Sequence, residues 1–84
     1  MHESGMIRRL VDLALAEAER RASRLAAVHI RLGVLAGGSV EHLREHFAVE
    51  LEQRGFAGID LDVTADPDYP GGVELTGVDL VDES

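Results

Sequence analysis

The chain contains no cysteine, lysine or tryptophan. The lack of cysteine excludes disulfides, thiolate zinc sites and thiol nucleophiles, and the lack of lysine excludes Schiff-base chemistry. Aromatic residues are scarce, so the core must be aliphatic; the three present are Phe47, Phe56 and Tyr69. No apolar run approaches the roughly 20 residues of a membrane-spanning helix, and no signal-peptide pattern opens the chain. We therefore expect a cytoplasmic protein without a membrane partner.

The size and net charge of the chain limit the number of domains and the classes of function that it can have. A chain of 84 residues has room for a single two-layer core, which predicts one domain spanning residues 1–84. The formal net charge of -8 at pH 7 argues against nucleic-acid binding, because phosphate contacts require clustered basic side chains. The serines have no paired base, and the phosphate-loop, nucleophile-elbow and dinucleotide motifs are absent. We expect that the protein is not an enzyme.

Two segments have the periodicity of amphipathic helices. Residues 4–24 carry a wide apolar stripe with Ser4 as the N-cap, and residues 40–55 follow Ser39 as the N-cap and stop at Gly55. The stripe of the first helix includes Met6, Ile7, Leu10, Val11, Leu13, Ala14 and Ala18. The buried line of the second helix consists of Val40, Leu43, Phe47 and Leu51.

Three segments alternate with a period of two, as half-buried strands do. They span residues 26–35, 59–65 and 73–81. In the last segment the alternation of the apolar residues shifts by one position at Gly77, which predicts a β-bulge. The turn at 66–72 joins the last two strands, which we expect to be adjacent in a hairpin. The order helix–strand–helix–strand–strand predicts an α+β fold, with two helices packed on one face of a three-stranded mixed sheet. The inward residues of the first strand are expected to be Val28, Ile30, Leu32 and Val34.

Several stretches, in this order, are similar to one protein family. They are MHE at the start, Leu10, VHIRLGVLAG, EHLREHF, IDLDV and VELTGVDLV. The chain resembles the nickel-binding domain of the HypA/HybF nickel-insertion proteins, which help to mature [NiFe]-hydrogenases and sometimes urease. The family normally inserts a zinc domain with two CxxC pairs between the last two strands. Here the turn at 66–72 replaces that zinc module, so no zinc site is expected.

Met1, His2 and Glu3 form a potential chelating terminus. The amine of Met1 and the backbone nitrogen and imidazole of His2 can close fused rings around one ion, and Glu3 can add a nitrogen or oxygen ligand. Such a nitrogen-rich, square-planar set suits Ni(II) or Cu(II) better than Zn(II). The initiator methionine should be retained, because histidine is not one of the small residues that permit its removal. On chemistry alone a frayed terminus is the simpler interpretation, but the resemblance implies a nickel site at these three residues.

His42 and His46 are four residues apart on the second helix, so their side chains meet on one flank. The pair could clamp a divalent ion with Glu41 or Glu45 nearby, which makes it a possible auxiliary metal site. It lies beside the buried line, so a solvated helix face is the simpler interpretation. The resemblance assigns no role to these positions, because the family usually carries small residues at both.

His29 and Arg31 lie on the outward face of the first strand. The second strand presents Asp60 and Asp62 on its own outward face. The likelier role of His29 is therefore a cross-strand charge pairing with this acidic stripe.

The leading hypothesis is a metallochaperone or adaptor that delivers Ni(II) during maturation of a nickel enzyme, with [NiFe]-hydrogenase as the first candidate. The resemblance implies two partners, a HypB-like GTPase and the hydrogenase large subunit. One alternative is a metal-free interaction module of the maturation machinery, and another is a metal buffer that also uses His42 and His46. The sequence leaves open whether the domain forms a homodimer.

Overall fold

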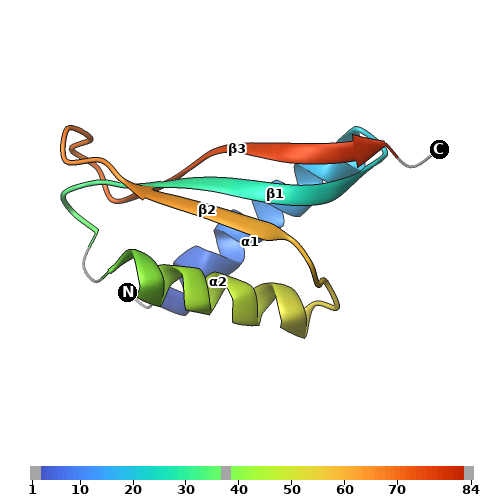
Figure 1. Ribbon diagram of the computed structural model, residues 1–84, viewed down its shortest axis with the longest axis horizontal. Helices are drawn as coiled ribbons and strands as arrows, with labels where there is room; N and C mark the ends of the chain where they lie inside the picture. Colours follow the sequence, from blue (N-terminus) through green and yellow to red (C-terminus); the bar gives the residue numbers. More distant parts are fainter. Residues whose placement is uncertain (1–2, 37–38, 83–84) are drawn as a thin grey trace.

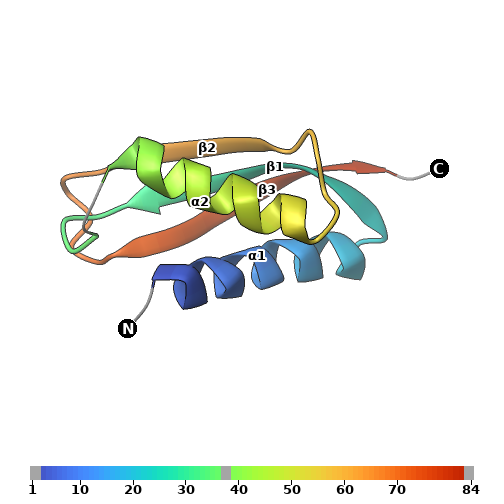
Figure 2. The same cartoon turned by 90° about the horizontal axis from the view of Figure 1, so that it is seen from below.

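The computed structural model describes residues 3–36 and 39–82. The elements follow in the expected order; in Figure 1 α2 lies below the sheet, and α1 runs obliquely behind the strands. Figure 2 shows that the two helices begin at the same end of the molecule, where β1 leads into its loop. The α+β class and its two layers are as predicted. The elements are α1 (Glu3–Arg20), β1 (Ser23–Leu32), α2 (Val40–Gln53), β2 (Asp60–Ala65) and β3 (Val73–Asp82).

The strand order corrects one expectation. The sheet has the order β2-β1-β3, so β2 and β3 lie on opposite sides of β1 and do not form the expected hairpin. β1 runs parallel to β2 and antiparallel to β3. The reason is that α2 is the crossover of a β1–α2–β2 unit, which places β2 parallel to β1 on one edge. The other edge of β1 is then left for β3.

Residues 66–72 therefore cross the end of β1 instead of making a hairpin turn. The segment is tied to the chain that leaves β1: the Gly33 nitrogen donates to the Gly72 carbonyl at 2.7 Å, and the Val34 nitrogen donates to the Tyr69 carbonyl at 3.0 Å. A Cβ on Gly33 would overlap the carbonyl oxygens of Gly71 and Tyr69. The close crossing of the two backbones requires glycine at this position.

The core lies between the sheet and the two helices and is aliphatic apart from Phe47, as expected. Its most deeply buried side chains come from three elements: Phe47, Ile7, Ile30, Val11 and Val28. Two predicted core positions are wrong. Val34 is 61% exposed because β1 ends at Leu32, and Leu13 is 53% exposed because it lies at the edge of the stripe on α1.

The ends of α1 differ from the prediction. The helix already includes Glu3, so Ser4 lies within its first turn and is not the N-cap. The helix stops at Arg20, four residues early, because Ala22 takes a left-handed φ of 52° and Ser23 already pairs with Asp82. The pairing with β3 prevails over the helical periodicity of this segment.

The predicted bulge in β3 is confirmed. The register with β1 shifts between Leu75 and Gly77, which leaves Thr76 as the extra residue. The Thr76 hydroxyl donates to the carbonyl of His29 at 3.1 Å. A second shift, at Ala26 of β1, was not predicted. Within the described ranges, no helix has the length and apolar character needed to cross a membrane.

Candidate functional site

The predicted nickel ligands are the first three residues of the sequence. Met1 and His2 fall outside the described residues, and Glu3 is the first residue of the helix. Ile7, one turn further along, lines a hollow of about 670 Å³ together with Glu45 and His46 of α2. The start of α1 is therefore close to the helix that carries the histidine pair.

Arg54 fixes α1 against α2. Its guanidinium forms ion pairs with Asp12 of α1 and, at 2.8 Å, with Glu50 of α2, and it donates to the Arg8 carbonyl at 3.3 Å. Asp12 and Glu50 together raise the pKa of Arg54, with Asp12 the larger cause. One side chain therefore joins both helices near the end of α2.

The backbone of α2 is held at both ends. The side chain of Ser39 accepts a hydrogen bond from the His42 nitrogen at 3.1 Å, which confirms the predicted N-cap. At the other end Gly55 has a φ of 87°, and the Phe56 nitrogen donates to the Leu51 carbonyl at 2.9 Å. This is the Schellman arrangement that a glycine after the last turn favours.

His42 and His46 are brought together as predicted. Their ring centroids are 4.3 Å apart, and the ring planes are inclined by 54°. Both side chains are exposed, whereas the adjacent Leu43 and Phe47 are buried. The helix therefore presents two imidazoles to solvent from an anchored backbone. Whether they bind metal remains a prediction.

The described part of the chain contains no larger ligand cluster. Across residues 3–36 and 39–82, no three His, Asp or Glu side chains are grouped so that they could hold a metal ion. The histidine pair is thus a two-ligand arrangement as far as these residues are concerned. The predicted terminal set lies mostly outside them.

His29 is fully engaged in the sheet. Its Nδ1 lies 2.9 Å from Oδ2 of Asp62 on β2, and its Nε2 lies 3.1 Å from Oδ2 of Asp79 on β3. These carboxylates, Asp62 first, raise the pKa of His29 above its ordinary value. The predicted pairing with the acidic stripe is confirmed at Asp62. Asp79 was missed because the bulge shifts the parity of β3 and turns this residue to the outer face.

Arg31 anchors the crossing segment to the same outer face. Its guanidinium lies 4.0 Å above the ring of Tyr69 and forms ion pairs with Glu74 and, at 3.5 Å, with Asp66. A cation above an aromatic ring is attracted by its negative face. These contacts hold residues 66–72 across the end of β1.

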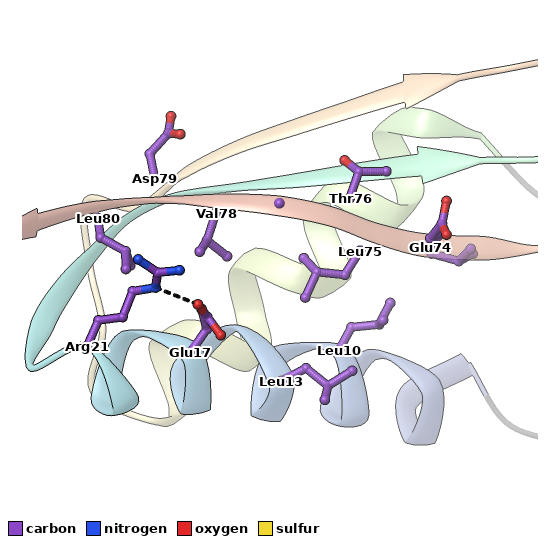
Figure 3. Close-up of a pocket in the computed structure, with 12 residues that line it drawn as sticks. Leu10, Leu13, Glu17, Arg21, Glu74, Leu75, Thr76, Val78, Asp79 and Leu80 are labelled. Atoms are coloured by element: carbon purple, nitrogen blue, oxygen red, sulfur yellow. Dashed lines mark hydrogen bonds and ion pairs between the residues drawn. The ribbon is translucent and has the colours of Figure 1, made fainter.

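An apolar groove of about 1100 Å³ lies between α1 and β3. Figure 3 shows Leu10, Leu75 and Val78 lining it, with the ion pair of Glu17 and Arg21 at 2.7 Å toward the end of α1. The two arginines beside Glu17, Arg20 first, lower its pKa. The groove is lined largely by apolar side chains of α1 and β3, which is a chemistry suited to association.

Comparison with known proteins identifies relatives. No protein-family model matches the chain. Proteins from two strains of Chloroflexus aurantiacus, both named hydrogenase maturation factor HypA, are 40% identical to it over 62 residues. The matched region is 73% of this chain and 54% of each relative, so the chain spans about half the length of these curated relatives.

The fold has a counterpart among solved structures. The solution structure of the Ni metallochaperone HypA from Helicobacter pylori has a TM-score of 0.76, with 99% of this chain and 100% of that chain covered. The sequences are 13% identical, so this likeness concerns the fold alone. The sequence match to the Chloroflexus proteins supports assignment of this chain to the HypA/HybF family as a partial-length member, and the shared fold agrees with that assignment.

Proposed function

We propose that the chain binds Ni(II) as cargo and delivers it during maturation of a nickel enzyme, with a [NiFe]-hydrogenase as the first candidate. The observation that carries this proposal is the 40% identity over 62 residues to proteins named hydrogenase maturation factor HypA. The structural neighbour is named a Ni metallochaperone, which supports nickel as the metal. These names describe maturation and metal transfer, in agreement with the expectation of a non-enzymatic role.

Met1, His2 and Glu3 are the proposed ligands of the ion. The terminal amine, backbone nitrogen and imidazole supply the strong-field donors that Ni(II) prefers over the tetrahedral sets of Zn(II). Binding requires a neutral imidazole and a deprotonated amine, so it releases protons and weakens at low pH. A chain end suits delivery, because an acceptor can displace its ligands one at a time.

Residues 1–84 act in this proposal as a single nickel-binding domain, and the segment 66–72 takes the place of the family's zinc module. Its hydrogen bonds to the chain that leaves β1 support this assignment, since they make a closed connection between β2 and β3. The chain has no cysteine, so its own residues cannot build a thiolate zinc site.

The proposed partners are a HypB-like GTPase, which takes part in loading, and the precursor of the hydrogenase large subunit, which receives the ion. The names of the relatives support contact with maturation machinery in general. A metal-free interaction module within that machinery is the second candidate function. The exposed apolar groove between α1 and β3 favours it.

Calorimetric titration of Ni(II) into untagged protein whose first residue is Met1 tests the proposal. We expect a site of micromolar or tighter affinity, about 8 kcal/mol or more in binding free energy. His2→Ala should abolish this site, because the imidazole closes one of the chelate rings. A metal-free module would bind no nickel at this affinity, and the substitution would change nothing.

His29→Gln is the matched control for that titration. It also removes one imidazole, but both nitrogens of that ring are already paired with Asp62 and Asp79. We expect unchanged nickel affinity in this variant. Loss of the tight site in both variants would show that the effect is not specific to the terminus.

A further inference from the structure

We propose that His42 and His46 form a second Ni(II) site, a two-imidazole clamp on α2 that is separate from the terminal ligands. The inference deepens the proposed function, on which it rests for the identity of the metal. The clamp would hold the same cargo more weakly and exchange it faster.

The spacing of the two rings fits a shared ion. Metal–nitrogen bonds of about 2.1 Å place the centre of each imidazole about 3.2 Å from the metal. If the two metal–nitrogen bonds meet at a right angle, the ring centres are about 4.5 Å apart. The ring centroids of His42 and His46 are 4.3 Å apart. The observed separation of the two rings is therefore close to the one that a shared ion requires.

The backbone of the clamp is preorganised. Leu43 and Phe47, each one residue beyond a histidine, are 4% and 0% exposed and anchor this face of α2 in the core. Ser39 caps the helix immediately before the pair. Little backbone order has to be gained on binding, and a preorganised pair binds more tightly than two mobile histidines.

The surroundings are acidic and therefore favour a cation. Glu45 lies between the two histidines in sequence and lines the same hollow as His46. Glu41 precedes His42 and forms an ion pair with Arg44 at 2.8 Å. Glu45 adds negative charge to this part of α2.

A clamp of this kind is suited to transfer. Since no group of three metal-binding side chains is found in residues 3–36 and 39–82, solvent would fill the remaining coordination positions of the ion. Few protein ligands mean weaker binding and faster release. The hollow that His46 shares with Ile7 places the clamp beside the first turns of α1.

His29 provides the contrast within the same chain. Both of its nitrogens are within 3.1 Å of carboxylate oxygens on neighbouring strands. A metal ion would have to displace an aspartate to reach either nitrogen. His29→Gln is therefore a matched control for substitutions of the clamp.

Ni(II) titration in the His2→Ala background tests the clamp independently of the terminus. We expect one remaining site, with a Kd of about 10–100 µM, that weakens at least about tenfold in His2→Ala/His42→Ala and in His2→Ala/His46→Ala. His2→Ala/His29→Gln should bind as His2→Ala does. Both clamp side chains are exposed, so circular dichroism should show these variants folded.

The two proposals fail in different ways. If His2→Ala binds no nickel, or if its remaining site is insensitive to both clamp substitutions, the clamp is refuted while terminal binding stands. If His2→Ala leaves the affinity of the wild type unchanged but the clamp substitutions abolish it, the clamp stands and the terminal site is refuted.

Discussion

The Nε2 of His29 on β1 lies 3.1 Å from the Oδ2 of Asp79 on β3, and a bulge interrupts the pairing of these two strands. The same imidazole contacts Asp62 through Nδ1, so one side chain connects all three strands on the outer face. The bulge at Thr76 makes this possible, because it places Asp79 on the same outer face of the sheet as His29. A residue that sequence alone assigns to a simple charge pair is therefore a link across the whole sheet.

The paired carboxylates predict a specific pH dependence of stability. They raise the pKa of His29 in the folded protein, so its stabilising effect is fully present below the unfolded pKa of about 6.5 and is lost as the pH rises through the folded pKa. Because the side chain is 34% exposed, we expect a contribution of only about 0.5 kcal/mol.

Urea unfolding of wild type and His29→Gln between pH 6 and pH 9 measures this effect. The wild type should be the more stable at pH 6, and the difference should shrink toward pH 9. A difference that stays constant or grows with pH would contradict the proposed role of the charged imidazole.

Arg54 is expected to contribute more to stability than the other surface arginines. Arg54→Ala removes contacts to Asp12, Glu50 and the Arg8 carbonyl, and its side chain is 25% exposed. We expect a loss of about 1–2 kcal/mol in the free energy of unfolding, measured in urea. Arg20→Ala is the control, because Arg20 is 66% exposed and its ion pair is with Glu17 of the same helix; the unfolding midpoint of this variant should not change. Equal effects of the two substitutions would argue against a link between the helices.

The elements themselves could be predicted from the sequence because each depends on local periodicity. The line of Leu43, Phe47 and Leu51 is buried as its spacing indicates, and the cap at Ser39 is confirmed by its hydrogen bond. The change of parity at Gly77 was sufficient to locate the bulge. Short-range patterns of this kind reflect burial on one face of a helix or strand.

The errors concern interactions between residues distant in sequence. Strand order depends on which edge of β1 is filled, and no local pattern distinguishes a hairpin from a segment that crosses the end of a strand. The end of α1 is set by the pairing of Ser23 with Asp82, 59 residues away. Asp79 could have been identified as a partner of His29 only by working out which face of the sheet the residues after the predicted bulge occupy.

Among the glycines that the structure describes, Gly33 is predicted to be the least tolerant of substitution. Its added Cβ would overlap backbone oxygens of Gly71 and Tyr69, which cannot move without breaking the hydrogen bonds of the crossing segment. We expect Gly33→Ala to cost about 1–3 kcal/mol in the free energy of unfolding. In Gly5→Ala the new methyl group meets nothing within 4 Å and lies in a helix, so that variant should be slightly stabilised. Thermal unfolding of both variants measures the contrast, and a stable Gly33→Ala would refute the close crossing.

The position of an affinity tag should decide how many nickel ions the chain binds. Any residue added before Met1 converts the terminal amine into an amide, which removes one proposed ligand and the tight site with it. The clamp of His42 and His46 lies on α2 and does not depend on that amine. An N-terminally extended protein should therefore keep only the weaker site, and a protein extended after Ser84 should keep both.

Nickel stoichiometry from calorimetry, with the extensions free of histidine, measures this difference. Identical titrations from the two forms would mean that the terminal amine is not a ligand. Loss of all binding in the N-terminally extended form would mean that the clamp does not act alone. If the two sites are separate, the N-terminally extended form should keep one weaker site while the other form keeps both, because only one of the sites depends on the chain end.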